Sequence, residues 1–173
     1  KPGDKDDAKF GDGISYVRFP EWYFCPSCRR FQPIGEWVKE YRAKNSKRAE
    51  EDPHMIQMMK CPKCFQELVV ARIITACEDG HIDDFPWVKW VHCQNFGGSK
   101  PVCSKPELTI TTSSSASEGL EGLTLKCLTC GATASLRGAF EPEMFRELDR
   151  KTGYQYDFRC TGKHPWKHKT EAC

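Results

Sequence analysis

Three Cys-x-x-Cys pairs carry most of the chemistry that this sequence can support. The pairs are Cys25/Cys28, Cys61/Cys64 and Cys127/Cys130. A two-residue spacer lets both thiolates of one turn bind the same ion, and two such turns complete a tetrahedral zinc site. Proline follows Cys25 and Cys61, and its fixed φ suits a reversal of the chain. The spacing therefore predicts zinc held by paired turns.

The cysteines and histidines can be divided into two zinc sites, or three. The first predicted site consists of Cys25, Cys28, Cys61 and Cys64. The second consists of Cys127, Cys130, Cys160 and Cys173, where His164 or His168 could replace one of the last two. A third would consist of Cys77, His81, His92 and Cys103, which leaves Cys93 unused. The alternative for this third set is that its cysteines are small buried apolar residues and its histidines only form hydrogen bonds.

The number and spacing of the cysteines favour metal ligands over disulfides. The chain has 173 residues and 11 cysteines, an odd number, and the cysteines stand mostly in close pairs. It contains neither a signal peptide nor a long apolar run, so we expect a soluble, cytoplasmic protein with reduced thiols and no membrane contact. Disulfides are the alternative. Because the chain begins at Lys1 without a Met, we expect it to be part of a longer protein.

The charge balance alone does not predict a nucleic-acid-binding protein. The chain has 26 Lys and Arg against 24 Asp and Glu, a net charge of +2. Basic residues gather at 29–30, 39–48 and 159–169, but such runs are most often solvated faces.

The motifs exclude several classes of enzyme. Zinc sites with four protein ligands and no water are structural rather than catalytic. The zinc deaminase pattern, His-x-Glu with Pro-Cys-x-x-Cys, fails because Ile-Asp follows His81 and Lys126 precedes Cys127. No phosphate-binding Gly-x-x-x-x-Gly-Lys-Ser/Thr loop is present. Asp83 and Asp84 could bind a divalent ion in a nuclease, but helix capping explains them more simply. We therefore predict no enzymatic activity.

The local patterns predict a small α+β fold, stabilised by zinc and built from ribbon-like β-hairpins with a few short helices. The predicted organisation is a disordered or linker segment at 1–13, a first zinc region at 14–67 with a charged insertion at 35–52, and a second cysteine-rich region at 68–173. Alternating or β-branched runs predict strands at 14–19, 68–75, 108–112, 123–126 and 133–136. Helices are predicted from Pro86, capped by Asp84 or Phe85, and at 141–150. Trp87, Trp90 and Val91 would share one face of the first helix.

Further motifs surround these cysteines. They are Arg18-Phe-Pro before Cys25-Pro-x-Cys28, Cys77-Glu-Asp-Gly-His81-Ile-Asp-Asp-Phe-Pro-Trp87 with Trp90 and His92, Cys127-x-x-Cys130-Gly-Ala, Ser135-Leu-x-Gly-Ala-Phe140, and Cys160-Thr-Gly-Lys-His-Pro-Trp166. Together they resemble the DrmB family of DISARM antiphage systems, a helicase-associated cysteine-rich family, over about residues 14–173. The resemblance implies that this chain is the N-terminal portion of a longer protein. It also implies that the twelve residues grouped above are metal ligands or scaffold.

The resemblance implies a non-catalytic zinc protein of bacterial or archaeal antiphage defence, with two zinc ions or three. Its partner would be a superfamily 2 helicase-like subunit, and it would help to engage foreign DNA and aid restriction; no small-molecule substrate is expected. Unpaired bases could stack on Trp22, Tyr23, Phe158 and Trp166. The alternative is a module that only docks a protein partner, such as a DNA-repair helicase, through an apolar patch at Phe85, Trp87 and Trp90.

Overall fold

A computed structural model describes residues 17–47, 60–112, 119–167 and 169–173. The described strands are β1 (Trp22–Phe24), β2 (Arg30–Pro33), β3 (Val69–Val70), β4 (Ile74–Ala76), β5 (Ile82–Asp84), β6 (Leu108–Thr112), β7 (Leu123–Cys127) and β8 (Thr133–Ser135). The described helices are α1 (Ile34–Lys44), α3 (Trp87–Cys93) and α4 (Met144–Lys151), with a 3₁₀ turn at Gly119–Gly122. The fold is α+β, as predicted. The predicted linker at 1–13 lies outside the described residues.

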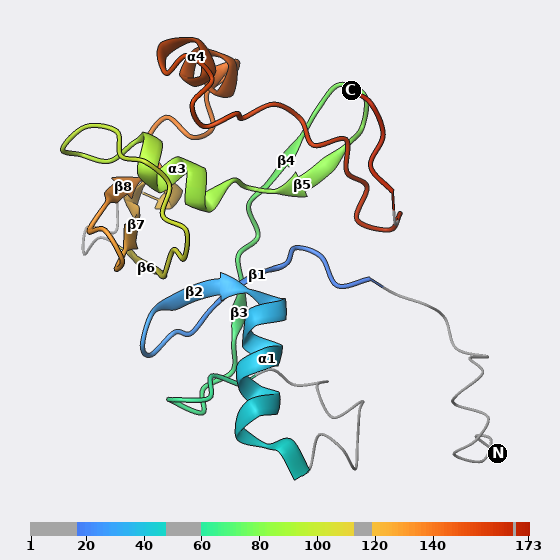
Figure 1. The fold of residues 1–173 in the computed structure, drawn as a ribbon, viewed down its shortest axis with the longest axis vertical. Helices are drawn as coiled ribbons and strands as arrows, with labels where there is room; N and C mark the ends of the chain where they lie inside the picture. Colours follow the sequence, from blue (N-terminus) through green and yellow to red (C-terminus); the bar gives the residue numbers. More distant parts are fainter. Residues whose placement is uncertain (1–16, 48–59, 113–118, 168) are drawn as a thin grey trace.

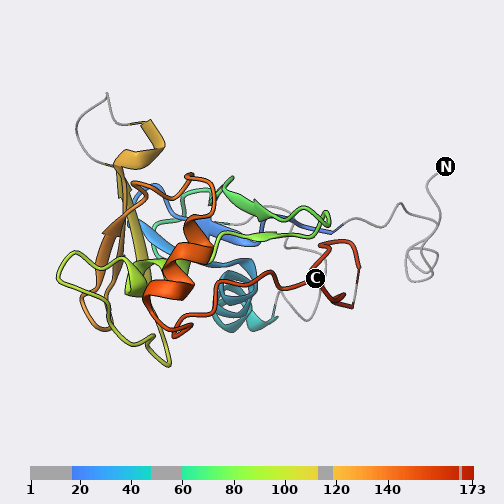
Figure 2. The same ribbon diagram turned by 90° about the horizontal axis from the view of Figure 1, so that it is seen from above.

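Six antiparallel strands form one sheet in the order β3-β1-β2-β6-β7-β8, and β4 pairs separately with β5. Figure 1 shows α1 beside β1–β3, and the β4–β5 hairpin beside the C-terminal segment. Seen from above in Figure 2, β6–β8 stand at one side of the molecule and the C-terminal segment at the other, with α4 between them. The sheet contains strands from both predicted regions, and the boundary between these regions stays a prediction.

The main core lies where α3 packs on β7 and β8. Trp87 and Trp90 are each only 1% exposed. The Trp87 ring meets Phe31 edge-on at 5.0 Å between centroids, and the Trp90 indole N–H donates to the Ser135 carbonyl at 2.9 Å. The predicted helix face is therefore confirmed. Because Phe85 is buried as well, these aromatic residues are core, and the predicted docking patch is wrong.

A second, smaller cluster lies under α1. Trp37 is fully buried there against Cys25 and Cys61, and its indole N–H donates to the Tyr23 carbonyl at 3.1 Å. Arg30 stacks over the Trp37 ring at 5.0 Å. Trp37, within the predicted insertion at 35–52, is therefore part of this core cluster, while 48–52 are outside the described residues.

The predicted strand at 68–75 is wrong as a single element. It divides into β3 and β4, which belong to different sheets. The Ala71 N–H still donates to the Trp22 carbonyl at 2.8 Å, and the chain then leaves the six-stranded sheet for the hairpin. Of the predicted strand at 14–19, residues 17–19 form none, and 14–16 are not described.

The strands and the helix predicted after residue 107 are confirmed. β6, β7 and β8 form the expected strands and hairpin, and α4 falls within one to three residues of the predicted helix. Within the described ranges, no helix has the length and apolar character needed to span a bilayer.

Candidate metal centres

The structure gathers twelve Cys and His residues into three groups, in each of which four donor atoms lie within 4.8 Å of one another. Centre 1 consists of Cys25, Cys28, Cys61 and Cys64. Centre 2 consists of His92, Cys103, Cys127 and Cys130. Centre 3 consists of Cys77, His81, Cys160 and Cys173. Each group could hold one metal ion.

The distances between donors suit tetrahedral coordination. With Zn–S near 2.3 Å and Zn–N near 2.05 Å, two ligand sulfurs are about 3.8 Å apart, and a sulfur and a nitrogen about 3.5 Å. Cys28 Sγ and Cys61 Sγ lie 3.8 Å apart, as do Cys77 Sγ and Cys173 Sγ. His92 Nε2 lies 3.4 Å from Cys130 Sγ. Disulfides require about 2.05 Å between sulfurs, and all eleven cysteines are free.

The three Cys-x-x-Cys turns share one backbone geometry. In each turn the N–H of the fourth residue after the first cysteine donates to the carbonyl of that cysteine, at 2.8–2.9 Å. The N–H of the first cysteine donates in turn to the carbonyl of the fifth residue, at 2.8–3.0 Å. The fourth residue has a left-handed φ: Arg29 at 63°, Phe65 at 58° and Gly131 at 74°. These hydrogen bonds fix the turn, so both thiolates point to one side.

Centre 1 joins two such turns across the small core cluster. The first turn links β1 to β2, and the second is closed by a bridge between Lys60 and Glu67. Cys25 and Cys61 are fully buried, and both pack against Trp37. The predicted first site is therefore the set of residues that the structure brings together.

Centre 2 combines the third turn with α3. His92 is fully buried, and its Nδ1–H donates to the Val88 carbonyl at 2.7 Å. A backbone partner at Nδ1 leaves Nε2 unprotonated toward Cys130, which is how metal-binding histidines are commonly oriented. Lys100 donates to the carbonyl of Cys130 at 3.0 Å and places its positive charge next to the thiolates.

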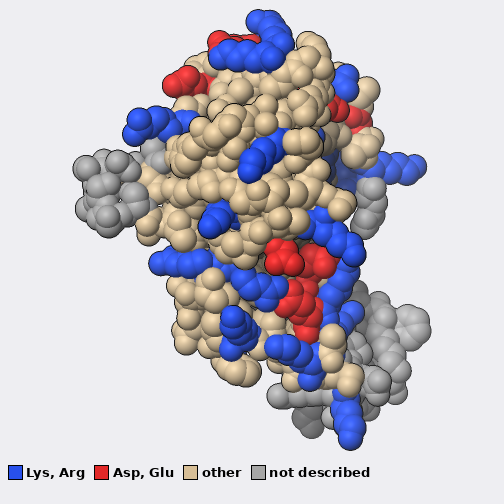
Figure 3. Space-filling model, turned by 60° about the vertical axis from the view of Figure 1, so that its left-hand side comes forward, with Lys and Arg blue, Asp and Glu red and all other residues tan. Residues whose placement is uncertain are grey.

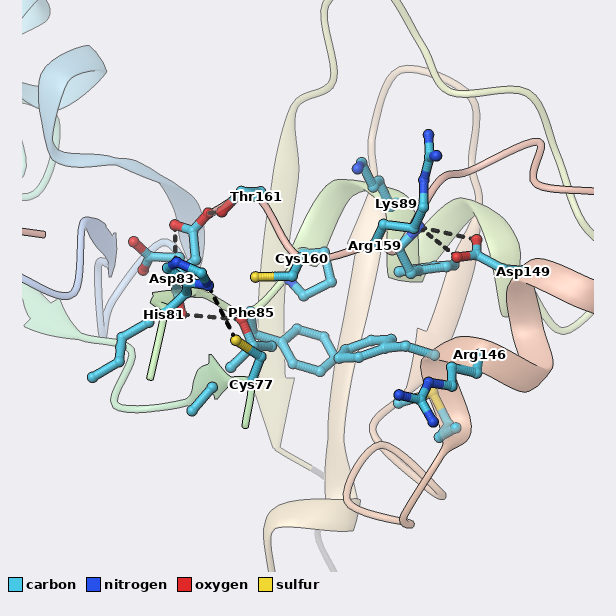
Figure 4. A pocket seen from close by; sticks show the side chains of 18 of the residues that line it. Cys77, His81, Asp83, Phe85, Lys89, Arg146, Asp149, Arg159, Cys160 and Thr161 are labelled. Atoms are coloured by element: carbon cyan, nitrogen blue, oxygen red, sulfur yellow. Dashed lines mark hydrogen bonds between the residues drawn. The ribbon is translucent and has the colours of Figure 1, made fainter. Parts of the chain in front are cut away.

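Centre 3 joins the β4–β5 hairpin to the C-terminal segment. Cys77 and His81 stand at the two ends of the hairpin turn, where the Cys77 N–H donates to the His81 carbonyl at 3.1 Å. His81 Nδ1 lies 3.3 Å from Cys77 Sγ. Figure 4 shows the sulfurs of Cys77 and Cys160 beside the His81 ring. The segment is fastened to the hairpin by the Ile82 N–H, which donates to the Lys163 carbonyl at 2.9 Å.

The predicted membership of the second and third sites is therefore wrong, although the same residues are used. Cys160 and Cys173 join Cys77 and His81, while His92 and Cys103 join the third turn. The reason is tertiary. Helix α3 packs on β7 and β8 and brings His92 to that turn, and after α4 the chain runs to the β4–β5 hairpin.

One thiol in each centre has a pKa below its ordinary value. Burial raises the pKa of Cys25, but N–H groups of Cys28 and Ser27 donate to its sulfur and lower the net pKa. The same balance of burial against backbone donors lowers the pKa of Cys130, and that of Cys77 to about 7. A lowered pKa favours the thiolate, which is the form that binds metal.

A second thiol in each centre shows the opposite shift. Burial and the neighbouring sulfurs raise the pKa of Cys28 to about 12 and that of Cys103 to about 11. At Cys173 the Asp79 carboxylate is the largest cause, and the pKa rises to about 12. Thiolates this close repel one another, so the four donors of a centre can all be in their binding form only when a cation lies between them.

The acidic pair before α3 does not cap the helix. Asp84 accepts from the backbone N–H groups of Glu21, at 3.0 Å, and Trp22, at 3.4 Å. Asp83 accepts from the Thr161 hydroxyl at 2.8 Å and from Lys163 Nζ at 3.1 Å. The capping prediction is therefore wrong, because both carboxylates fasten distant segments to the hairpin. Their partners are protein groups, so a nuclease site at this pair gains no support.

A cleft of about 1160 Å³ lies beside centre 3, between the hairpin and α4 (Figure 4). Its basic lining side chains are Lys89, Arg146 and Arg159. Its acidic lining side chains are Glu78, Asp79, Asp83, Asp84, Glu141, Glu143, Asp149 and Asp157. Acidic groups thus outnumber basic ones, which makes the cleft unsuitable for a phosphate backbone.

Five of the ten described Lys and Arg residues in the predicted basic clusters form ion pairs within the chain. The pairs are Arg30–Glu40, Lys39–Glu36, Arg159–Asp157, Lys163–Glu21 and Asp83, and Lys167–Glu171. Figure 3 shows acidic side chains among the Lys and Arg side chains of one face. Of the aromatic residues expected to stack on bases, Phe158 is buried, and Trp22 and Tyr23 are half-buried in the core clusters. Trp166 is exposed.

One structurally important residue was not predicted from the sequence. Gly162 has a φ of 66°, and a Cβ there would lie 1.7 Å from the Glu171 carbonyl oxygen. Glycine therefore allows the chain end, which carries Cys173, to reach centre 3. The only signal in the sequence is a glycine two residues after Cys160.

Comparison with known proteins agrees with the motifs. The whole chain, residues 1–173, matches the family described as "Domain of unknown function (DUF8724)". It is also similar to the DISARM protein DrmB of Bacillus paralicheniformis, with 32% identity over 108 residues, which are 62% of this chain and 16% of that protein. The chain thus spans about a sixth of that relative, and the resemblance to DrmB is confirmed. With three four-donor Cys/His centres on an α+β frame, the chain belongs to the DUF8724 family and is DrmB-like.

Proposed function

We propose that this chain is a non-catalytic, zinc-binding module of a cytoplasmic, DISARM-like antiphage defence assembly. In this proposal it partners a superfamily 2 helicase-like subunit and helps to engage foreign DNA. The module supplies a rigid frame, because zinc at each centre would fasten segments that the small cores alone hold weakly.

The observation that carries this proposal is the complete use of donors in centres 1–3. Each contains four Cys or His donors, so a tetrahedral ion would have no position left for water or substrate. Such saturation is typical of structural zinc. The described Cys residue outside these sets, Cys93, is buried, and burial raises its pKa, so it is not an activated nucleophile.

The face of β6–β8 opposite the core residues Leu108 and Leu125 is the surface that best fits a DNA backbone. Arg30, Thr109, Lys126 and Thr133 form one cross-strand row from β2 to β8. The Arg30 end is covered by α1, where Arg30 pairs with Glu40. Lys126 is exposed, and the described residues offer it no acidic partner. Lysine and threonine are common phosphate-contacting residues, so we place the DNA contact at the β6–β8 end of this row.

DNA binding is tested with purified protein and fluorescein-labelled duplex and single-stranded oligonucleotides across a salt series. We expect measurable affinity at low salt that falls steeply toward about 0.2 M salt. Lys126→Glu should weaken binding to every sequence and reduce the salt slope by about 1, the loss of one phosphate contact. Lys151→Glu on α4 is the matched control, since Lys151 is also exposed but lies outside the sheet.

A module that only docks a protein partner is the second candidate, and the acidic cleft favours it. Its acidic lining side chains outnumber its basic ones by eight to three, and this balance suits a basic protein segment better than DNA. If the purified protein binds no DNA at low salt and still co-purifies with the helicase-like subunit, the docking function replaces the DNA contact. If it does neither, the proposed function is wrong.

A further inference from the structure

A second set of donors adjoins centre 3. A ring nitrogen of His81, a ring nitrogen of His164 and a carboxylate oxygen of Glu171 all lie within 4.8 Å of one another. His81 belongs to both sets. Its Nδ1 faces Cys77 Sγ at 3.3 Å, so its Nε2, on the opposite edge of the ring, is available to another partner.

The His164 ring is buried without a full set of partners. Its side chain is 12% exposed, and its Nδ1 is shielded from solvent with no hydrogen-bond partner among the described residues. Its Nε2 lies 3.6 Å from Glu171 Oε2, and its ring centroid lies 5.0 Å from that of His81. A buried polar atom without a partner destabilises the folded chain, so a ligand or ion at this ring would be favourable.

Glu171 is held in place by the backbone. Its N–H donates to the Gly162 carbonyl at 2.7 Å, and only glycine at 162 permits this approach. One carboxylate oxygen, Oε1, contacts Lys167, while Oε2 faces His164. Glu171 is therefore fixed near the two imidazoles, although it is half-exposed.

We propose that His81, His164 and Glu171 form a second divalent-cation site that shares His81 with centre 3. Two imidazoles and a carboxylate suit Zn²⁺, Co²⁺ or Fe²⁺ and leave coordination positions open to water. A divalent ion and three thiolates give centre 3 a net charge of −1, which favours a second cation nearby. Coordination through His81 Nε2 releases the proton of that nitrogen to solvent. The proposal rests on metal binding at centre 3 and is independent of the defence function.

The test uses Co²⁺ as the probe. Purified protein is titrated with Co²⁺ under reducing conditions, while bound metal is counted by mass spectrometry and thiolate coordination is followed by the charge-transfer absorption. We expect four ions per chain, with the charge-transfer absorption complete after three. The fourth ion should add only the weaker absorption of nitrogen and oxygen coordination, because its ligands include no new thiolate.

Two variants locate the fourth ion. Glu171→Gln and His164→Ala should each bind three ions with unchanged thiolate absorption, and should weaken the fourth by more than about 100-fold, since even outer-shell changes cost about 10- to 100-fold. Lys167→Ala should tighten the fourth site, because it removes the cation that competes for Glu171. Glu147→Gln is the matched control and should change nothing, because Glu147 is an exposed carboxylate of α4 that belongs to none of the donor sets.

Three results would overturn the proposal. Wild-type protein that binds only three ions has no such site. Loss of thiolate absorption in His164→Ala, in protein that remains folded, would make His164 a ligand of the centre-3 ion. A fourth ion that survives Glu171→Gln unchanged would lie elsewhere.

Discussion

Replacing Gly162 by alanine should detach the chain end from centre 3. A Cβ at this position would lie 1.7 Å from the Glu171 carbonyl oxygen and 2.8 Å from its carbonyl carbon. The oxygen would have to retreat by about 1.8 Å to reach an ordinary contact of roughly 3.5 Å. Metal–ligand distances tolerate only about 0.2 Å, so Cys173, two residues further on, would leave the centre.

Gly153→Ala is the matched control for Gly162→Ala. Gly153 also has a positive φ, 58°, but a Cβ there meets nothing within 4 Å. Both substitutions carry the cost of a left-handed alanine, about 1–2 kcal/mol. Gly162→Ala also loses the 2.7 Å hydrogen bond from the Glu171 N–H, worth about 1 kcal/mol, so we expect it to cost about 2–3 kcal/mol in total.

The assay for Gly162→Ala is metal release to a chelating indicator, together with metal content and thermal unfolding. We expect the centre-3 ion to leave rapidly from Gly162→Ala and no ion to leave rapidly from Gly153→Ala. Equal release rates and equal stabilities in the two variants would refute the role of Gly162 and the placement of Cys173 in centre 3.

Three further predictions concern the metal and two local features. Metal removal by a chelator under reducing conditions should abolish the near-ultraviolet circular dichroism of the buried Trp residues and make unfolding non-cooperative. A cooperative unfolding transition in the metal-free protein would contradict the structural role of the centres. Phe65→Gly should stabilise the protein by up to about 1 kcal/mol in chemical denaturation, because Phe65 has a φ of 58° and is exposed. Gly131→Ala should destabilise it by about 1 kcal/mol. A change of the same sign in both variants would be inconsistent with the shared turn geometry. The hydrogen bond from Arg30 lowers the pKa of Glu40, so the Arg30–Glu40 pair stabilises the fold above the ordinary pKa of 4.5, and this stabilisation is lost as the pH falls through the lower folded pKa. The difference in unfolding free energy between wild type and Glu40→Gln should therefore shrink with acidification. A constant difference would exclude this linkage.

The sequence predicted most reliably the features that depend on residues close together in the chain. The spacing of Cys25 and Cys28 predicts a turn whose hydrogen bonds join residues at most five positions apart. Both cysteines can therefore be identified as ligands without knowledge of the fold. The hairpin of β7 and β8 and helix α4 were likewise visible in local patterns of apolar, turn and capping residues. The ligands of centre 1 could be predicted from the sequence because two complete Cys-x-x-Cys turns supply all four of them.

The left-handed positions show where local sequence patterns are insufficient. Gly131 could be expected at φ > 0, since glycine adopts that region without strain. Arg29 and Phe65 occupy the same place in the other two turns, yet their side chains give no signal of it. There the hydrogen bonds of the turn impose the conformation on an unfavourable residue.

Residue types and short spacings identified twelve Cys and His residues as ligands, the pairs that share a turn, and Cys93 as the remaining thiol. Which distant ligands meet depends on how the elements pack. His92 reaches Cys130 because α3 packs on β7 and β8, and Cys160 reaches Cys77 because the segment after α4 returns to the hairpin. Asp84 changed from a predicted helix cap to an acceptor for the start of β1 for the same reason. Ligand spacing within a turn is a short-range property of the backbone, whereas the assembly of a centre depends on how the sheet and helices are packed.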